Sequence, residues 1–175
     1  AKLVFAGDGS MRADLEVRAR HRRIHRAVRF LGYRGGEELV DIFKIADVVC
    51  IPSRNEPFGI VVLEAWSAAK PVLVTHNGGP SEYVDHEVNG LRIYENPHSV
   101  AWGIHRIFDD FDHARAMGAN GRAKVERGFT WDIVAEQTLD VYAPHRIRPT
   151  RIDDKNKPNG DGSGQHAESA RPAGV

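Results

Sequence analysis

Short apolar runs alternate along the chain with longer segments in which apolar residues recur at helical spacing. The runs have no polar alternation, which is typical of strands buried on both faces of a parallel sheet. The run VVCI at 48–51 is therefore expected to be fully buried. Strands are predicted at residues 2–7, 27–33, 48–51, 71–75 and 90–94.

The segments between the strands predict helices. The clearest start is at Asn96, an N-cap residue, followed by Pro97 at the first helical position. Thr130 precedes another helix in the same way. Helices are predicted at 11–26, after the Gly35-Gly36 turn, after Gly59, briefly near Glu82, after Asn96, at 112–128 and at 131–142.

Repeated alternation of strand and helix predicts an α/β fold, a doubly wound Rossmann-like parallel sheet with helices on both faces. Residues 1–145 are assigned to this one domain. Residues 146–175 are rich in Pro, Gly, Ser and charge and almost free of large apolar side chains, so a disordered tail is expected there.

Composition narrows the class of protein. The chain has 175 residues, is 41% hydrophobic and has a formal net charge of zero. The charge balance gives no indication of binding to nucleic acid or to an anionic membrane, and no apolar run is long enough to span a bilayer. The N-terminus lacks the features of a signal peptide, so a cytoplasmic location is expected. Cys50, the single cysteine, is interpreted as a core residue, and no metal-ligand spacing is found.

Four loops follow the predicted strands and are expected at one edge of the sheet, where doubly wound folds bind ligands. Several contain glycines just before a helix, which favours contact between backbone amides and phosphate, although a tight turn explains the same residues. Neither a GxGxxG fingerprint nor a P-loop is present. The loops are Gly7–Ser10, Tyr33–Gly36, Ser53–Gly59 and Thr75–Pro80.

Two carboxylates bracket the third loop and the helix after it. Glu56 lies in the loop, and Glu64 lies on the helix. At helical spacing Glu64 is surrounded by Ile60, Val61 and small residues, where an unpaired carboxylate is costly. A polar partner for Glu64 is therefore expected.

The string SRNEPFGIVVLEA at 53–65 resembles the Glu-any seven-Glu signature of retaining, nucleotide-sugar-dependent glycosyltransferases of family 4, within the GT-B fold. Residues 3–9 (LVFAGDG), 29–33 (RFLGY) and 78–90 (GGPSEYVDHEVNG) resemble further segments of that family. The resemblance extends over residues 1–143 and is strongest to the glycogen-synthase-like and sucrose-synthase-like branch.

This resemblance implies roles for individual residues. Glu56 and Glu64 are the catalytic pair: Glu64 would accept hydrogen bonds from the donor ribose, and Glu56 would bind hydroxyls of the transferred sugar. Amides at Phe58 and Gly59 would bind sugar hydroxyls or diphosphate. The implied donor site is completed by Gly7, Gly9, Tyr33, Ser53, Arg54, Pro57, Ile60, Gly78 and Gly79.

The implied reaction is transfer of a hexosyl group, glucose first, with retained configuration and without a cofactor. The implied donors are ADP-glucose or UDP-glucose, with GDP-mannose third. Relatives carry a phosphate-pairing Arg and Lys, and an N-terminal acceptor domain, that this sequence does not contain, so the chain alone is expected to be inactive. The alternatives are a non-catalytic nucleotide-sugar-binding module and another GT-B enzyme such as an epimerase.

Overall fold

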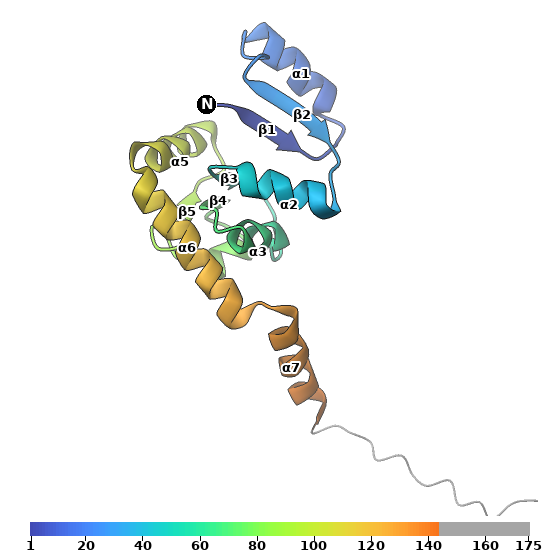
Figure 1. Ribbon diagram of the computed structural model, residues 1–175. Coiled ribbons are helices and arrows are strands. Elements are labelled where there is room, and N and C mark those ends of the chain that lie inside the picture. The colour runs from blue at the N-terminus through green and yellow to red at the C-terminus, as the bar shows by residue number, and fades with distance from the viewer. Residues whose placement is uncertain (144–175) are drawn as a thin grey trace, which may run out of the picture.

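The computed structural model describes residues 1–143, and the predicted tail at 146–175 lies outside this range. Strands and helices alternate through most of the described chain (Figure 1). In chain order the elements are β1 Leu3–Ala6, α1 Arg12–His21, β2 Val28–Gly32, α2 Gly36–Ile45, β3 Val49–Ile51, α3 Ile60–Ser67, β4 Val72–Thr75, α4 Pro80–Tyr83, β5 Leu91–Ile93, α5 Pro97–Asp109, α6 Phe111–Gly128 and α7 Trp131–Tyr142.

All the strand pairs are parallel, as predicted, but the hydrogen bonds form two sheets. One sheet has the order β1-β2, and the other has the order β3-β4-β5. Within the described residues, no ladder joins β1 to β3, so each of these strands has one unpaired edge. The α/β class with helices against parallel strands is confirmed.

The larger sheet carries the core, and β4 is its centre. Val72 and Val74 belong to one cluster of buried residues, while Leu73 belongs to a second cluster. Because side chains alternate along a strand, the two clusters lie on opposite faces of the sheet. α3 covers the first face and α5 covers the second, and α6 contributes to both. This is the doubly wound arrangement that the apolar run at 71–75 predicts.

Trp66 is the largest side chain that is fully buried. Its indole Nε1 donates a hydrogen bond to the Asn89 carbonyl at 2.9 Å, which satisfies the polar atom in the core. α6 approaches the indole closely at Gly121, where a Cβ would overlap the ring carbon Cδ1. The contact between α3 and α6 therefore depends on the absence of a side chain at position 121.

Two predicted features are wrong in detail. The helix predicted at 11–26 ends at His21, because Arg23 adopts a left-handed φ of 58° and the Ile24 amide bonds back to the Ala19 carbonyl. The strand at 48–51 is only half-buried, because β3 pairs on one side alone. Cys50 on this strand packs against the second cluster, and burial raises the pKa of its thiol to about 11.

α7 begins where predicted, with the Thr130 hydroxyl accepting a hydrogen bond from the Ile133 amide. It contains no buried residue, and it extends away from the rest of the described chain (Figure 1). Trp131 at its start is 80% exposed. No helix of the described residues is long and apolar enough to cross a membrane.

Replacing Gly121 by alanine tests the α3–α6 contact. We expect Gly121→Ala to lower the free energy of unfolding by about 1–3 kcal/mol, because the new methyl group overlaps the Trp66 ring. Gly128→Ala, on the same helix with open space around its Cβ position, is the matched control and should leave stability unchanged or raise it by up to about 1 kcal/mol. Urea denaturation measures both, and equal effects would contradict the proposed overlap.

Candidate functional site

Two loops meet at the carboxyl ends of β3 and β4. The buried Thr75 hydroxyl donates to the Ser53 carbonyl at 2.6 Å, and the Gly79 amide donates to the Glu56 carbonyl at 2.8 Å. These bonds join the segment 53–59, which we call the glutamate loop, to the end of β4 and to the segment 76–83, which we call the glycine loop. The sequence predicts all four loops at one edge of a single sheet; the structure brings these two together after β3 and β4, while the other two follow the strands of the second sheet.

Glycines allow the two backbones to approach each other. A Cβ at Gly79 would overlap the Pro57 carbonyl oxygen, and a Cβ at Gly78 would lie 2.7 Å from the Glu56 carbonyl oxygen. Gly78 also has a φ of +90°, which other residues rarely adopt. Gly59, with a φ of +84°, turns the glutamate loop into α3. The glycines at 59, 78 and 79 are therefore required by the geometry of the loops.

Tyr83 fastens the end of the glutamate loop. Its hydroxyl lies 2.6 Å from the Phe58 carbonyl and 3.0 Å from the Gly59 carbonyl, so it can donate to either. The ring packs against Phe58 and Trp66. Burial, with the nearby charge of Glu56, raises the pKa of the Tyr83 hydroxyl, which therefore stays protonated as a donor.

α6 holds this part of the glycine loop in place. The Lys124 ammonium donates to the Tyr83 carbonyl at 2.7 Å and to the Asp85 carboxylate at 2.8 Å. The Asn89 amide adds a hydrogen bond to the same carboxylate. The bond from Lys124 is the main reason why the pKa of Asp85 is lowered. The loop is thus connected to the core through side chains that are distant in sequence.

Backbone amides and one carboxylate at the glutamate loop could bind a ligand. In the described chain, the amides of Gly59, Ile60 and Val61 have no hydrogen-bond partner, and α3 has no side-chain cap. Free amides at a helix start attract anions. The Glu56 carboxylate is half-buried and lies 3.5 Å from the Phe58 amide. Arg54 is exposed and makes no hydrogen bond or ion pair with described residues.

Glu64 lies one helical turn beyond Ile60. It belongs to α3, the helix that begins where the glutamate loop ends. It is half-buried, and within residues 1–143 it has no hydrogen-bond or ion-pair partner. Burial raises the pKa of the Glu64 carboxyl above its ordinary value. The polar partner that the sequence predicts is therefore not supplied by the described protein residues.

The other predicted loops form a second group, after β1 and β2. The Gly7 amide donates to the Gly32 carbonyl at 2.8 Å, and the Gly9 carbonyl accepts from the Arg12 amide. Tyr33 follows β2 and is 79% exposed. A hollow of about 240 Å³ lies beside Gly7 and Gly9, between Phe5 and Arg12. Among the described residues, no hydrogen bond joins this group to the glutamate loop.

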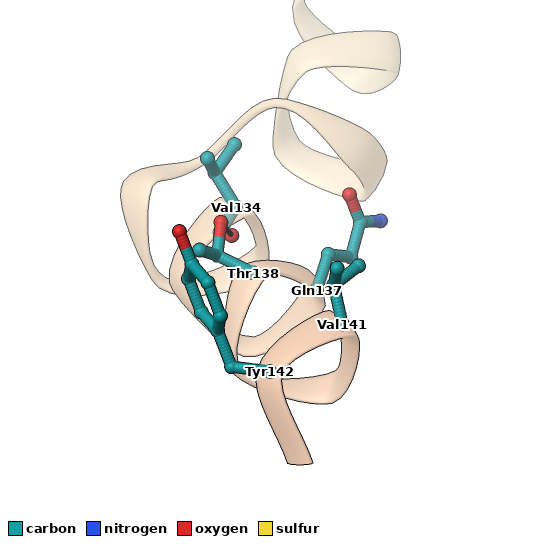
Figure 2. A pocket seen from close by; sticks show the side chains of 5 residues that line it. All are labelled: Val134, Gln137, Thr138, Val141 and Tyr142. Atoms are coloured by element: carbon teal, nitrogen blue, oxygen red, sulfur yellow. Dashed lines mark hydrogen bonds between the residues drawn. The ribbon is translucent and has the colours of Figure 1, made fainter. Parts of the chain in front are cut away.

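A larger hollow of about 330 Å³ lies along α7 (Figure 2). No charged side chain lines this hollow. In the chain, α7 comes after both groups of loops. Its lining residues are Val134, Gln137, Thr138, Val141 and Tyr142. Within the described range, no group of His, Cys, Asp and Glu gathers in a way that could hold a metal ion.

Sequence reasoning missed Thr75 and Tyr83 as supports of the site. Both lie inside segments that it identified, but their letters do not reveal that their hydroxyls bond to carbonyls 22 to 25 residues away. The tyrosine directly after Gly-Gly-Pro-Ser-Glu is the available signal. It becomes informative only once its hydroxyl is known to bond to the carbonyls of Phe58 and Gly59.

The first 124 residues match the family described as Glycosyl transferases group 1. The chain is 44% identical over 143 residues to an uncharacterised glycosyltransferase of Methanocaldococcus jannaschii, covering 81% of this chain and 37% of that protein. It is 33% identical over 141 residues to a glycogen synthase of Mycobacterium tuberculosis, covering 80% and 34%. The chain thus spans about a third of the length of these relatives.

Solved structures agree with this relationship. Sucrose-phosphate synthase of Thermosynechococcus elongatus has a TM-score of 0.74 and 32% identity, covering 82% of this chain and 37% of that one. The HepE protein of Anabaena, solved with UDP-glucose, has a TM-score of 0.73 and 24% identity, covering 82% and 41%. The resemblance to the glycogen-synthase-like branch is confirmed, and the second structure supports the fold.

Removing the Tyr83 hydroxyl tests whether it fastens the glutamate loop. We expect Tyr83→Phe to lower the free energy of unfolding by about 0.5–1.5 kcal/mol, because the ring contacts remain and only the hydrogen bonding is lost. Tyr94→Phe is the control, since Tyr94 is 64% exposed and its hydroxyl bonds to no described residue. Chemical denaturation measures both, and an equal loss would refute a specific role for the Tyr83 hydroxyl.

Neutralising Glu64 should stabilise the chain without ligand. Burial raises the pKa of the Glu64 carboxyl in the folded state. Above that pKa, the charged carboxylate destabilises the folded state relative to the unfolded one. Below the ordinary pKa of 4.5, the carboxyl is protonated in both states and this destabilisation disappears. Glu64→Gln should therefore raise the urea midpoint at pH 7 and leave it unchanged near pH 4, about half a unit below that value. Glu126→Gln, which removes a surface ion pair with Arg122, should give no such gain. A lower midpoint for Glu64→Gln at pH 7 would contradict the desolvation argument.

Proposed function

The chain belongs to the glycosyl transferase group 1 family, and we propose that it binds the donor in an enzyme that transfers a hexosyl group to a carbohydrate hydroxyl. The proposed donor is a nucleoside-diphosphate sugar. UDP-glucose and ADP-glucose are the preferred candidates, and GDP-mannose ranks after them. The names glycogen synthase and sucrose-phosphate synthase among its relatives support a sugar substrate. The UDP-glucose held by the Anabaena protein supports this class of donor.

The observation that carries the proposal is the Glu64 carboxylate on α3, which has no hydrogen-bond or ion-pair partner within residues 1–143. A half-buried carboxylate without a partner is destabilising, and the two adjacent hydroxyls of a ribose would satisfy both of its oxygens. The free amides of Gly59, Ile60 and Val61 would then donate hydrogen bonds to the negative diphosphate at the start of α3. One ligand would satisfy both features.

In this arrangement Glu56 would bind hydroxyls of the transferred sugar. The Gly79 bond and the glycine contacts hold the Glu56 backbone, so its carboxylate would be fixed relative to the α3 amides. Position and charge, more than a protein nucleophile, would lower the barrier. We propose that the nucleoside diphosphate leaves from the face that the acceptor attacks, and that the configuration is retained.

The glycine loop and the first pair of loops would complete the donor site. Gly78 and Gly79 would approach the nucleotide or its phosphates, and Tyr33 would lie beside the base, where its backbone is accessible. Gly7 and Gly9 border the hollow on the same sheet as Tyr33. Because the chain spans about a third of its relatives, we propose that the acceptor is bound by a further domain.

A donor titration followed by amide chemical shifts tests this function. With UDP-glucose, ADP-glucose or GDP-mannose, we expect shifts at residues 56–61 and at Gly78 and Gly79. Glu64→Ala should weaken the affinity about 10- to 100-fold, since hydrogen bonds to a charged group contribute roughly 1.5–3 kcal/mol.

The control is Glu126→Ala, which removes an exposed carboxylate on α6 and should leave the affinity unchanged. Unchanged affinity in Glu64→Ala would refute the ribose contact. If none of the three donors shifts these amides in the full-length protein, the donor-binding proposal is wrong. Binding without transfer to any carbohydrate acceptor would favour the non-catalytic module.

A further inference from the structure

An unusual concentration of positive charge lies between the end of α1 and the start of β2. This stretch has six arginines and no acidic residue, while the whole chain has a net charge of zero. The remaining sequence therefore carries six excess negative charges. All six side chains are exposed, and we call them the basic edge: Arg18, Arg20, Arg22, Arg23, Arg26 and Arg29.

The fold collects these arginines at the amino ends of β1 and β2. The strands are parallel, and Leu3 is in register with Val28, so both begin at the same edge. The Lys2 ammonium lies 3.3 Å from the Arg26 carbonyl and adds a further charge there. The Gly7 and Tyr33 loops follow the carboxyl ends of the same strands. In Figure 1 the end of α1 and the start of β2 lie at the opposite end of this sheet from those loops.

Nothing described in the protein neutralises the basic edge. Ion pairs within residues 1–143 involve Arg12, Arg34, Arg106, Arg115 and Arg122, but none involves the six arginines. Like charges at this density repel one another, so an external anion would be favoured.

The backbone that carries the basic edge is well ordered by hydrogen bonds. The Arg23 amide donates to the Arg20 carbonyl, and the Ile24 amide donates to the Ala19 carbonyl, at 2.9 and 3.0 Å. The left-handed conformation of Arg23 turns the chain sharply after α1. A fixed turn presents its guanidinium groups at lower entropic cost than a disordered basic tail would.

One guanidinium group can donate two parallel hydrogen bonds to the oxygens of one phosphate. Six of them on one edge therefore favour a ligand surface that displays many phosphates. Two features favour lipid headgroups over nucleic acid. Ile24 is 48% exposed among the arginines and would insert between headgroups. No Phe, Tyr or Trp occurs from Ala6 to Arg29 to stack on bases.

We propose that the basic edge docks the protein on an anionic lipid bilayer. Docked in this way, the Gly7 and Tyr33 loops point away from the lipid and remain open to a donor from water. The zero net charge of the sequence predicts no attraction to membranes, but it averages over the acidic remainder of the chain. The interaction depends on the local charge within a Debye length, which the fold determines.

Vesicle co-sedimentation of the full chain tests this proposal. With vesicles of phosphatidylcholine containing about 30% phosphatidylglycerol at about 0.15 M salt, we expect partition that is absent from pure phosphatidylcholine and lost at about 0.5 M salt. The triple variant Arg20→Gln, Arg22→Gln, Arg23→Gln should partition about 100-fold less, since each basic residue near an anionic surface adds roughly fivefold.

The matched control removes the same charge elsewhere, with Lys44→Gln, Arg115→Gln and Arg127→Gln. It should partition as the unmodified protein does, and so should the triple variant Arg20→Lys, Arg22→Lys, Arg23→Lys, which keeps the charge. The proposal would be overturned if the Arg20, Arg22 and Arg23 glutamine variant and its control lost vesicle binding equally. It would also be overturned if the unmodified protein did not bind the vesicles. A tighter complex with duplex DNA or RNA, or saturation by millimolar inorganic phosphate, would also overturn it.

Discussion

The candidate site depends on the close approach of two backbones, at Gly78–Gly79 and Glu56–Pro57. Any side chain at position 79 would overlap a carbonyl oxygen, so the contact permits only glycine. Once the two segments touch, the Gly79 amide bonds to the Glu56 carbonyl, and Tyr83 is brought within reach of Phe58 and Gly59. The position of the Glu56 backbone beside the start of α3 follows from this one steric condition.

Much of the fold could be predicted from the sequence because the strands and helices of the larger sheet are specified by short, contiguous segments of the chain. The run at 71–75 is apolar without alternation, and the structure buries it on both faces. Local signals also place the start of α5 at Asn96. The exposure of β3 could not be predicted, since it depends on which strands pair. The early end of α1 was missed because residues 22–26 do not exclude a helix, and Arg23 takes a conformation that arginine rarely adopts.

The loops of the candidate site could be located in the sequence, but the contacts that hold them could not. Glycine and glutamate positions could be identified in the sequence, and the glutamate and glycine loops do meet. The supports come from Thr75, Tyr83 and Lys124, whose hydrogen bonds link segments far apart in the chain. Spacing cannot reveal such contacts. Glu64 shows the opposite case, because its unfavourable position is visible in the sequence and persists in the structure. A carboxyl whose pKa is raised by burial, with no partner among residues 1–143, is a candidate ligand contact.

β1 has one unpaired edge, and its residues Leu3, Val4 and Phe5 are 47%, 43% and 38% exposed. Strands of parallel sheets are normally covered on both faces, so this one is unusually open. An uncovered apolar strand offers backbone donors and acceptors to any other chain in an extended conformation. Where β1 stays uncovered, intermolecular strand pairing is therefore favoured at high concentration. Covering β1 would remove this edge while leaving the glutamate and glycine loops, which follow β3 and β4, in place.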